Sequence, residues 1–199
     1  MTASDGTQIG LWPTDSSAHG LLALCQAKGI PTNGMPHAEA RQVEWLAERL
    51  LLDEMTGDAA LTHDPQGNPR LPGSDIHISI SHTRGMVVVA LNDDHPIGID
   101  IEHEGRSAMR VRLRFLHGDE LEQITSPAEV LLAWTAKEAI YKLFGGGVLA
   151  DEVTLDFHNP EAPTALCRGQ KIVIERIPLD GHILTLAYRQ QSPEPTHHQ

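Results

Sequence analysis

The sequence predicts an α+β fold with two similar halves, each with helices packed on a small, mainly antiparallel sheet. A segment with helical periodicity is followed by strand-like segments twice, first at WLAERLLL and again at WTAKEAIYKL, so that Trp45 and Trp134 hold similar places. Two such halves would enclose a ligand cleft between them. We therefore expect pseudo-twofold halves at residues 1–95 and 96–190, and a disordered tail at 191–199. A single sequence leaves open whether the likeness is a true repeat.

The N-terminal half is expected to hold one long helix and the first strands. A short strand is predicted at residues 8–12. The helix spans residues 38–55 and ends before Gly57, because apolar residues recur there at helical spacing. Residues 64–75 are rich in proline and glycine and are predicted to form a loop.

Three strand patterns follow that loop, separated by polar turns typical of an antiparallel meander. They cover residues 76–81, 86–91 and 97–102. A loop and a helix are expected over 106–123, and a second long helix begins at Ser126 or Pro127 and ends before Gly145–Gly147. The last strands are predicted near residues 152–157, 171–177 and 182–188.

Charge and composition restrict the partners of the protein. The chain has 199 residues with 15 Lys and Arg against 27 Asp and Glu, a net charge of -12. Nucleic acid is not expected as a partner, because binding its phosphates normally requires a basic surface. The two cysteines suggest no disulfide framework, and no apolar run is long enough for a transmembrane helix. We expect a cytoplasmic protein that does not bind membranes.

Carboxylates carry the most specific chemical signal. In IGIDIEH the isoleucines alternate with Gly98, Asp100 and Glu102, so that period 2 directs both acids to one strand face. If Glu138 of the second long helix joined them, the three acids would form a hard oxygen site suited to Mg²⁺. A solvated strand face is the alternative explanation for Asp100 and Glu102.

The second long helix places Trp134, Glu138 and Lys142 four residues apart on one face. An exposed ion pair between Glu138 and Lys142 would be the simpler interpretation. Trp134 and Tyr141 flank that face, however, so we expect it to be partly covered. A partly buried charged pair is more typical of a functional site.

Three segments together, IHISISHT, IGIDIEH and WTAKEAIYK, resemble the 4'-phosphopantetheinyl transferase superfamily. The likeness is to the surfactin-synthetase-activating, pseudodimeric form in its short bacterial version, and it covers about residues 64–147. The resemblance implies an enzyme that transfers the 4'-phosphopantetheine group of coenzyme A to a serine of an acyl or peptidyl carrier protein, releasing adenosine 3',5'-bisphosphate. Mg²⁺ would be the cofactor.

The resemblance also assigns roles to the residues of the three segments. Asp100, Glu102 and Glu138 would hold the metal, with Glu102 the least certain ligand, and Glu138 would act as general base. Lys142 would pair with a phosphate oxygen. Lys137 would either reach the diphosphate or remain solvated.

Coenzyme A would be held by residues of the N-terminal half. Ser81 and His82 match the serine–histidine element of the family. In GNPRLP, Asn68 replaces a lysine that is usual in the family, and Arg70 is expected to supply the missing charge. Two cations of the first long helix are further candidates for the nucleotide phosphate, although a solvated helix face is the better explanation for each of them singly: Arg41 and Arg49.

The segment MRVRLRFL is the most concentrated positive run in the chain, and the family docks carrier proteins near this region. The residues expected to contact the carrier are Met109, Arg110, Val111, Arg112, Leu113 and Arg114. A monomer is expected, because the cleft is internal. The alternatives are another Mg²⁺-dependent phosphoryl-transfer enzyme, such as a pyrophosphatase or phosphodiesterase, and a non-catalytic carrier-binding module.

Overall fold

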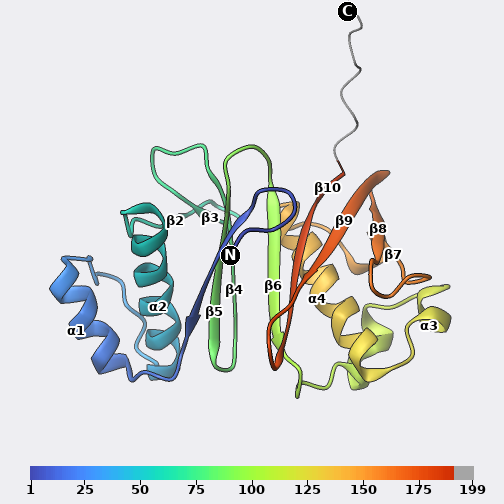
Figure 1. The fold of residues 1–199 in the computed structure, drawn as a ribbon, viewed down its shortest axis with the longest axis horizontal. Helices are drawn as coiled ribbons and strands as arrows, with labels where there is room; N and C mark the ends of the chain where they lie inside the picture. The colour runs from blue at the N-terminus through green and yellow to red at the C-terminus, as the bar shows by residue number, and fades with distance from the viewer. Residues whose placement is uncertain (191–199) are drawn as a thin grey trace, which may run out of the picture.

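A computed structural model of the protein describes residues 1–190. Two antiparallel sheets lie side by side in the middle of the molecule, with α1 and α2 on one outer side and α3 and α4 on the other (Figure 1). The predicted α+β class is confirmed. The tail predicted for 191–199 lies outside the described residues.

The N-terminal half contains a three-stranded sheet in the order β1-β5-β4. The strands of this sheet are β1 (Gln8–Pro13), β4 (His77–Thr83) and β5 (Met86–Asn92). The helices of this half are α1 (Ala18–Lys28) and α2 (Glu39–Thr56). A small two-stranded ribbon is formed by β2 (Thr62–His63) and β3 (Pro69–Arg70). Helix α1 was not predicted, although its end signals are present in the sequence. The Ser17 hydroxyl accepts a hydrogen bond from the Gly20 N–H, and Gly29 ends the helix with a φ of 72°.

The C-terminal half contains a five-stranded sheet in the order β6-β10-β9-β8-β7. Its strands are β6 (Ile97–His103), β7 (Val153–Asp156), β8 (Thr164–Cys167), β9 (Gln170–Ile177) and β10 (His182–Arg189). Its helices are α3 (Glu120–Gln123), α4 (Pro127–Leu143), and the 3-10 turns η1 (Met109–Arg114) and η2 (Ala150–Glu152). Strand β8 was not predicted.

The predicted meander is only half right. Strands β4 and β5 pair antiparallel, with Ile78 opposite Leu91. Strand β6 instead pairs with β10, where Ile99 lies opposite Leu186. The isoleucines of β6 then enter an apolar cluster between the two sheets with residues of β1, β5 and β10. Burial of such side chains stabilises the fold by roughly 1.5–3 kcal/mol each.

The two halves share a strand order. The first strand of each half pairs with the last, and the last pairs with the strand before it, as β1-β5-β4 and β6-β10-β9. One long helix, α2 or α4, covers the outer side of each sheet (Figure 1). The predicted boundary between residues 95 and 96 falls in the turn between β5 and β6. The pseudo-twofold relation itself stays a prediction.

Candidate functional site

Side-chain hydroxyls join β4 to β6 at the seam between the two sheets. Ser81 Oγ accepts a hydrogen bond from the Ile101 N–H at 3.4 Å, and Thr83 Oγ1 accepts one from the His103 N–H at 3.3 Å. Both hydroxyls also donate to carboxylates, since Ser81 reaches Asp100 Oδ1 at 2.8 Å and Thr83 reaches Glu102 Oε2 at 3.1 Å. The seam therefore fixes the direction of the two strand carboxylates.

Gly98 brings α4 unusually close to the same strand. A Cβ atom at this position would lie 1.9 Å from the Ala139 carbonyl oxygen, which is helix backbone. Because glycine allows this approach, Lys142 Nζ reaches the Ile99 carbonyl at 2.9 Å and Asp100 Oδ1 at 2.7 Å. The predicted Glu138–Lys142 helix face is thus directed at the carboxylate face of β6.

Glu138 lies half-buried on this helix face. Burial, followed by the negative charge of Asp100, raises the pKa of the Glu138 carboxyl above its ordinary value. Its side chain lines a cavity of about 270 Å³ together with Trp134 and Tyr141. Glu138 and Asp100 are therefore close enough to influence each other, and Glu138 faces a space that a ligand can enter.

Glu102 forms an ion pair that was not predicted from the sequence. Its Oε1 accepts a hydrogen bond from Arg106 Nη1, four residues along the chain. The Arg106 guanidinium also lies over the Trp134 ring, 5.3 Å from its centroid. Since Thr83 occupies Oε2, both oxygens of Glu102 are already hydrogen-bonded.

The residues present fit a divalent cation, although not as the predicted set of three. In residues 1–190 no group of three or more His, Cys, Asp or Glu side chains is arranged to hold a metal ion. Asp100 Oδ2 is buried and has no hydrogen-bond partner within that range. This free oxygen and the Glu138 carboxylate suit Mg²⁺, which takes one or two carboxylates with water and phosphate.

His82 and Arg41 lie together, as expected for two candidates that share one ligand. Arg41 Nη1 is 3.4 Å from His82 Nε2, and His82 Nδ1 is 3.3 Å from Glu44 Oε1. Burial lowers the pKa of His82, which favours a neutral ring. The Arg41 side chain is 64% exposed and forms an ion pair with Glu44, at 3.2 Å between Nη1 and Oε2.

Three candidates have partners other than those predicted. Arg49 lies 3.2 Å above the Trp45 ring and donates to the Trp45 carbonyl, so that the guanidinium packs within α2. The proton of the Ser81 hydroxyl is donated to Asp100. The structure thus places Arg49 and Ser81 in packing and positioning contacts rather than in the predicted phosphate contacts.

Lys137 is the third candidate with partners other than those predicted, and its side chain points into the protein. Its Nζ donates to Glu120 Oε2 at 2.9 Å and to the carbonyls of Phe115, Ala150 and Val153. Burial lowers its pKa, but the Glu120 carboxylate opposes that effect. Both alternatives considered from the sequence, a phosphate contact and a solvated ammonium, are wrong for this structure because all three ammonium protons already have buried acceptors.

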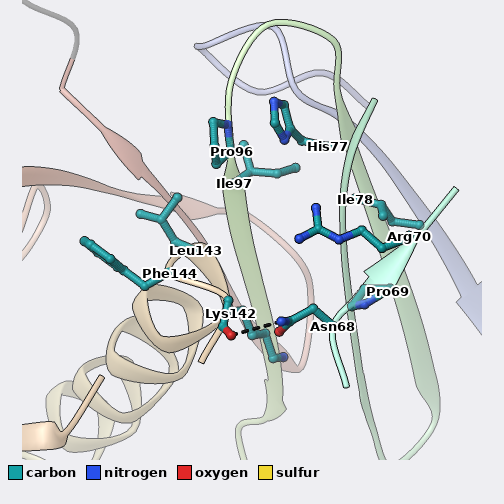
Figure 2. Close-up of a pocket in the computed structure, with 11 residues that line it drawn as sticks. Asn68, Pro69, Arg70, His77, Ile78, Pro96, Ile97, Lys142, Leu143 and Phe144 are labelled. Atoms are coloured by element: carbon teal, nitrogen blue, oxygen red, sulfur yellow. Dashed lines mark hydrogen bonds between the residues drawn. The ribbon is translucent and has the colours of Figure 1, made fainter. Parts of the chain in front are cut away.

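A second cavity, of about 200 Å³, lies between the halves (Figure 2). Arg70 and His77 line one side, and Leu143 and Phe144 of the other half line the opposite side. Asn68, which stands in the expected lysine position, donates to the Gly145 carbonyl at 2.9 Å and so links the two halves. A ligand cleft between the halves, as predicted, is present here.

Arg70 lies beside this linkage. Its Nη2 donates to Asp64 Oδ2 at 3.2 Å, and the guanidinium remains 60% exposed. Hydrogen bonds from Asn68, with a smaller contribution from Arg70, lower the pKa of Asp64 to about 2. Arg70 is therefore part of an ion pair at the cavity edge.

The positive segment forms the 3-10 turn η1 at the surface. Leu113 is 74% exposed. Met109 and Val111 are partly buried and pack against the core of their own half. The arginines at 110 and 114 are exposed, and Arg112 is half-buried.

Sequence reasoning missed Thr83 and Arg106, the two side chains that hold Glu102. A signal for Thr83 was present, because it lies two residues after Ser81 on the same strand and therefore on the same face. Arg106 gave no such signal, since it follows the end of β6 in an irregular turn.

Comparisons with known proteins agree with this geometry. The profile of the family described as "4'-phosphopantetheinyl transferase superfamily" matches residues 96–187, which include the carboxylates, Arg106 and all of α4. The chain is 35% identical over 80 residues to 4'-phosphopantetheinyl transferase gsp of Aneurinibacillus migulanus, which covers 37% of this chain and 33% of that protein. It is 40% identical over 78 residues to 4'-phosphopantetheinyl transferase psf-1 of Bacillus pumilus, covering 36% and 33% respectively.

A longer match extends to another relative. The chain is 31% identical over 116 residues to 4'-phosphopantetheinyl transferase AcpT of Salmonella typhimurium, covering 53% of this chain and 60% of that protein. The matches span from a third to three-fifths of the relatives' own lengths. Residues 96–187, which carry the candidate site, are thus similar to the 4'-phosphopantetheinyl transferase superfamily.

Proposed function

We propose that this protein transfers the 4'-phosphopantetheine group of coenzyme A to a serine hydroxyl of an apo carrier protein. The serine oxygen would attack the phosphorus attached to pantetheine, and the bond to the bridging oxygen would break to release adenosine 3',5'-bisphosphate. The observation that supports this most directly is the meeting of Asp100, Glu138 and Lys142 at the seam of the two halves, within the segment that matches the family.

The side chains at the seam suit this reaction. Glu138 lines the cavity, where its carboxylate would accept the serine proton. Lys142 supplies a positive charge beside Asp100, where the diphosphate would lie. Magnesium held by Asp100 and Glu138, with Glu102 as the less certain third ligand, would neutralise the diphosphate and stabilise charge that develops in the transition state.

Coenzyme A is proposed to lie in the cleft between the halves. Arg41 with His82, and Arg70 at the cavity edge, offer cationic or hydrogen-bonding groups to its phosphates from the N-terminal half. The carrier is proposed to approach from the side of η1, whose exposed arginines complement an acidic partner. Residues 1–190 contain no helix with the length and apolar character needed to cross a membrane.

The decisive experiment mixes the full chain with coenzyme A, Mg²⁺ and several apo carrier proteins, and measures the carrier masses. Addition of one phosphopantetheine group to at least one carrier is expected, with adenosine 3',5'-bisphosphate in equal amount. A pyrophosphatase or phosphodiesterase would release phosphate or nucleotide without any carrier. A carrier that binds without gaining mass would indicate the non-catalytic alternative.

The docking surface can be tested separately. Charge reversal of three arginines to Glu, at Arg110, Arg112 and Arg114, is expected to raise the KM for the carrier by about tenfold and to leave the KM for coenzyme A within about twofold. Lys171, an exposed residue of β9, provides a single charge reversal elsewhere on the surface as a control. Equal loss for both substrates would contradict docking at η1.

A further inference from the structure

Arg106 occupies a place where a cation is expected. Its guanidinium contacts the Glu102 carboxylate and lies over the Trp134 ring, and its positive charge also acts on the nearby Glu138 carboxyl. The Glu102 side chain is 8% exposed, whereas that of Arg106 is 50% exposed. The pair therefore has one fixed, buried member and one member that is free to leave.

The carboxylates of Asp100 and Glu102 differ in whether one of their oxygens remains without a hydrogen-bond partner in residues 1–190. Both oxygens of Glu102 are engaged, by Arg106 and Thr83. Asp100 uses only Oδ1, which accepts from Ser81 and Lys142, and its buried Oδ2 has no partner in residues 1–190. A divalent cation at the seam can thus reach Asp100 without breaking a contact, but it can reach Glu102 only by displacing Arg106 or Thr83.

From this difference we infer that Arg106 is a tethered cation that competes with the divalent metal for Glu102. In the protein without coenzyme A, Arg106 keeps Glu102 out of the metal site and limits the protein ligands to Asp100 and Glu138. Metal affinity is then low until a diphosphate adds its own oxygens. This inference rests on the proposed function only for the metal, and it concerns binding rather than transfer.

The test measures binding of Mn²⁺, used in place of Mg²⁺, to the full chain without coenzyme A by electron paramagnetic resonance of the free ion. Arg106→Gln is expected to bind Mn²⁺ about tenfold more tightly than the wild type, the factor that corresponds to a hydrogen bond to a charged group. Glu102→Gln alone is expected to change the affinity by less than about twofold.

The double variant separates direct competition from a general effect of charge. Glu102→Gln with Arg106→Gln is expected to lose the gain, because Glu102 is the group that Arg106 releases. Arg176→Gln is the matched control, since Arg176 lines the same surface groove of about 460 Å³ as Arg106. It should leave Mn²⁺ affinity unchanged to within about twofold.

Three results would overturn the inference. These are binding by Arg106→Gln that is no tighter than that of the wild type, a gain that persists in the double variant, and several-fold weaker binding by Glu102→Gln alone. Detectable binding only in Arg106→Gln would support it. Because no carrier or coenzyme A is present, these outcomes do not depend on whether the protein transfers phosphopantetheine, which the mass measurement decides separately.

Discussion

Helices α2 and α4 cover corresponding sheets, yet they handle charge and close packing differently. Each carries a tryptophan with an arginine guanidinium over it, Arg49 over Trp45 in α2 and Arg106 over Trp134 in α4. In α2 that arginine belongs to the helix itself. In α4 it comes from the turn after β6 and brings a second contact, to Glu102. The same local motif thus packs one helix and links elements of a site in the other.

The glycines of the two first strands show the same contrast. A Cβ on Gly10 of β1 would meet the side chains of Met55 and Leu51 at 2.5 and 2.8 Å, which can move. A Cβ on Gly98 of β6 would meet the backbone of α4, which cannot move without shifting the helix. The C-terminal half is therefore packed more closely at the point where Lys142 and Asp100 meet. The two halves thus have similar topology, and the candidate site arises from the closer packing and the buried charged groups of the C-terminal half.

The largest expected effect is on activity at Glu138. Glu138→Gln should lower the transfer rate by about 10³-fold, or about 4 kcal/mol, because it removes the proposed proton acceptor and metal ligand. Glu54→Gln, the same change on an exposed residue of α2, is the control and should retain normal turnover. Turnover is measured from carrier mass. Wild-type turnover of the Glu138→Gln protein would show that Glu138 takes no part in the reaction.

The next prediction concerns stability at Lys137, the buried charged residue three positions after Trp134. Lys137→Met should lower the free energy of unfolding by about 3–4 kcal/mol, because it leaves the Glu120 carboxylate, 1% exposed, without its cation. Urea unfolding gives the value. Lys28→Met breaks the exposed pair with Asp53 in the other half and should have little effect. Similar losses in both variants would show that burial of the pair is not the cause.

The glycine contrast predicts a smaller difference. Gly98→Ala should destabilise the protein by about 2–3 kcal/mol, since α4 must move away from β6. Gly10→Ala should cost less than about 1 kcal/mol, because Met55 and Leu51 can change rotamer. Both are measured by urea unfolding under one condition. Equal values would mean that the two helices approach their sheets with equal tolerance.

Glu48 lies three residues after Trp45, as Lys137 lies three residues after Trp134, and its effect on stability is expected to depend on pH. Burial raises its pKa from 4.5 to about 7. Between those values the folded protein holds more protons than the unfolded chain, so stability falls as the pH rises. Glu48→Gln should therefore stabilise the protein by about 3 kcal/mol at pH 8 and by almost nothing at pH 4.

Urea unfolding of both proteins across that pH range measures the difference. Glu39→Gln, at the exposed start of α2, is the matched control and should show no such trend. A constant difference between Glu48→Gln and wild type at every pH would show that the Glu48 carboxyl titrates normally in the fold.

Local patterns were sufficient for the elements that carry the site. The spacing of apolar residues predicted α2 and α4, and the Ile alternation predicted both β6 and the common face of Asp100 and Glu102. Order and spacing of the three motifs predicted the family, which the comparison confirms. These features depend on residues within a few positions of one another, so periodicity and capping rules can detect them.

The tertiary structure alone decided which charged groups meet. Almost every side of α4 is buried, so helical periodicity could not tell that Lys137 faces Glu120 while Glu138 faces the cavity. The pairing of β6 with β10, the hydroxyl contacts of Ser81 and Thr83, and the contact of Arg106 with Trp134 join segments distant in sequence. A buried charge takes the partner that tertiary packing brings within hydrogen-bond distance, and local sequence spacing does not determine that partner.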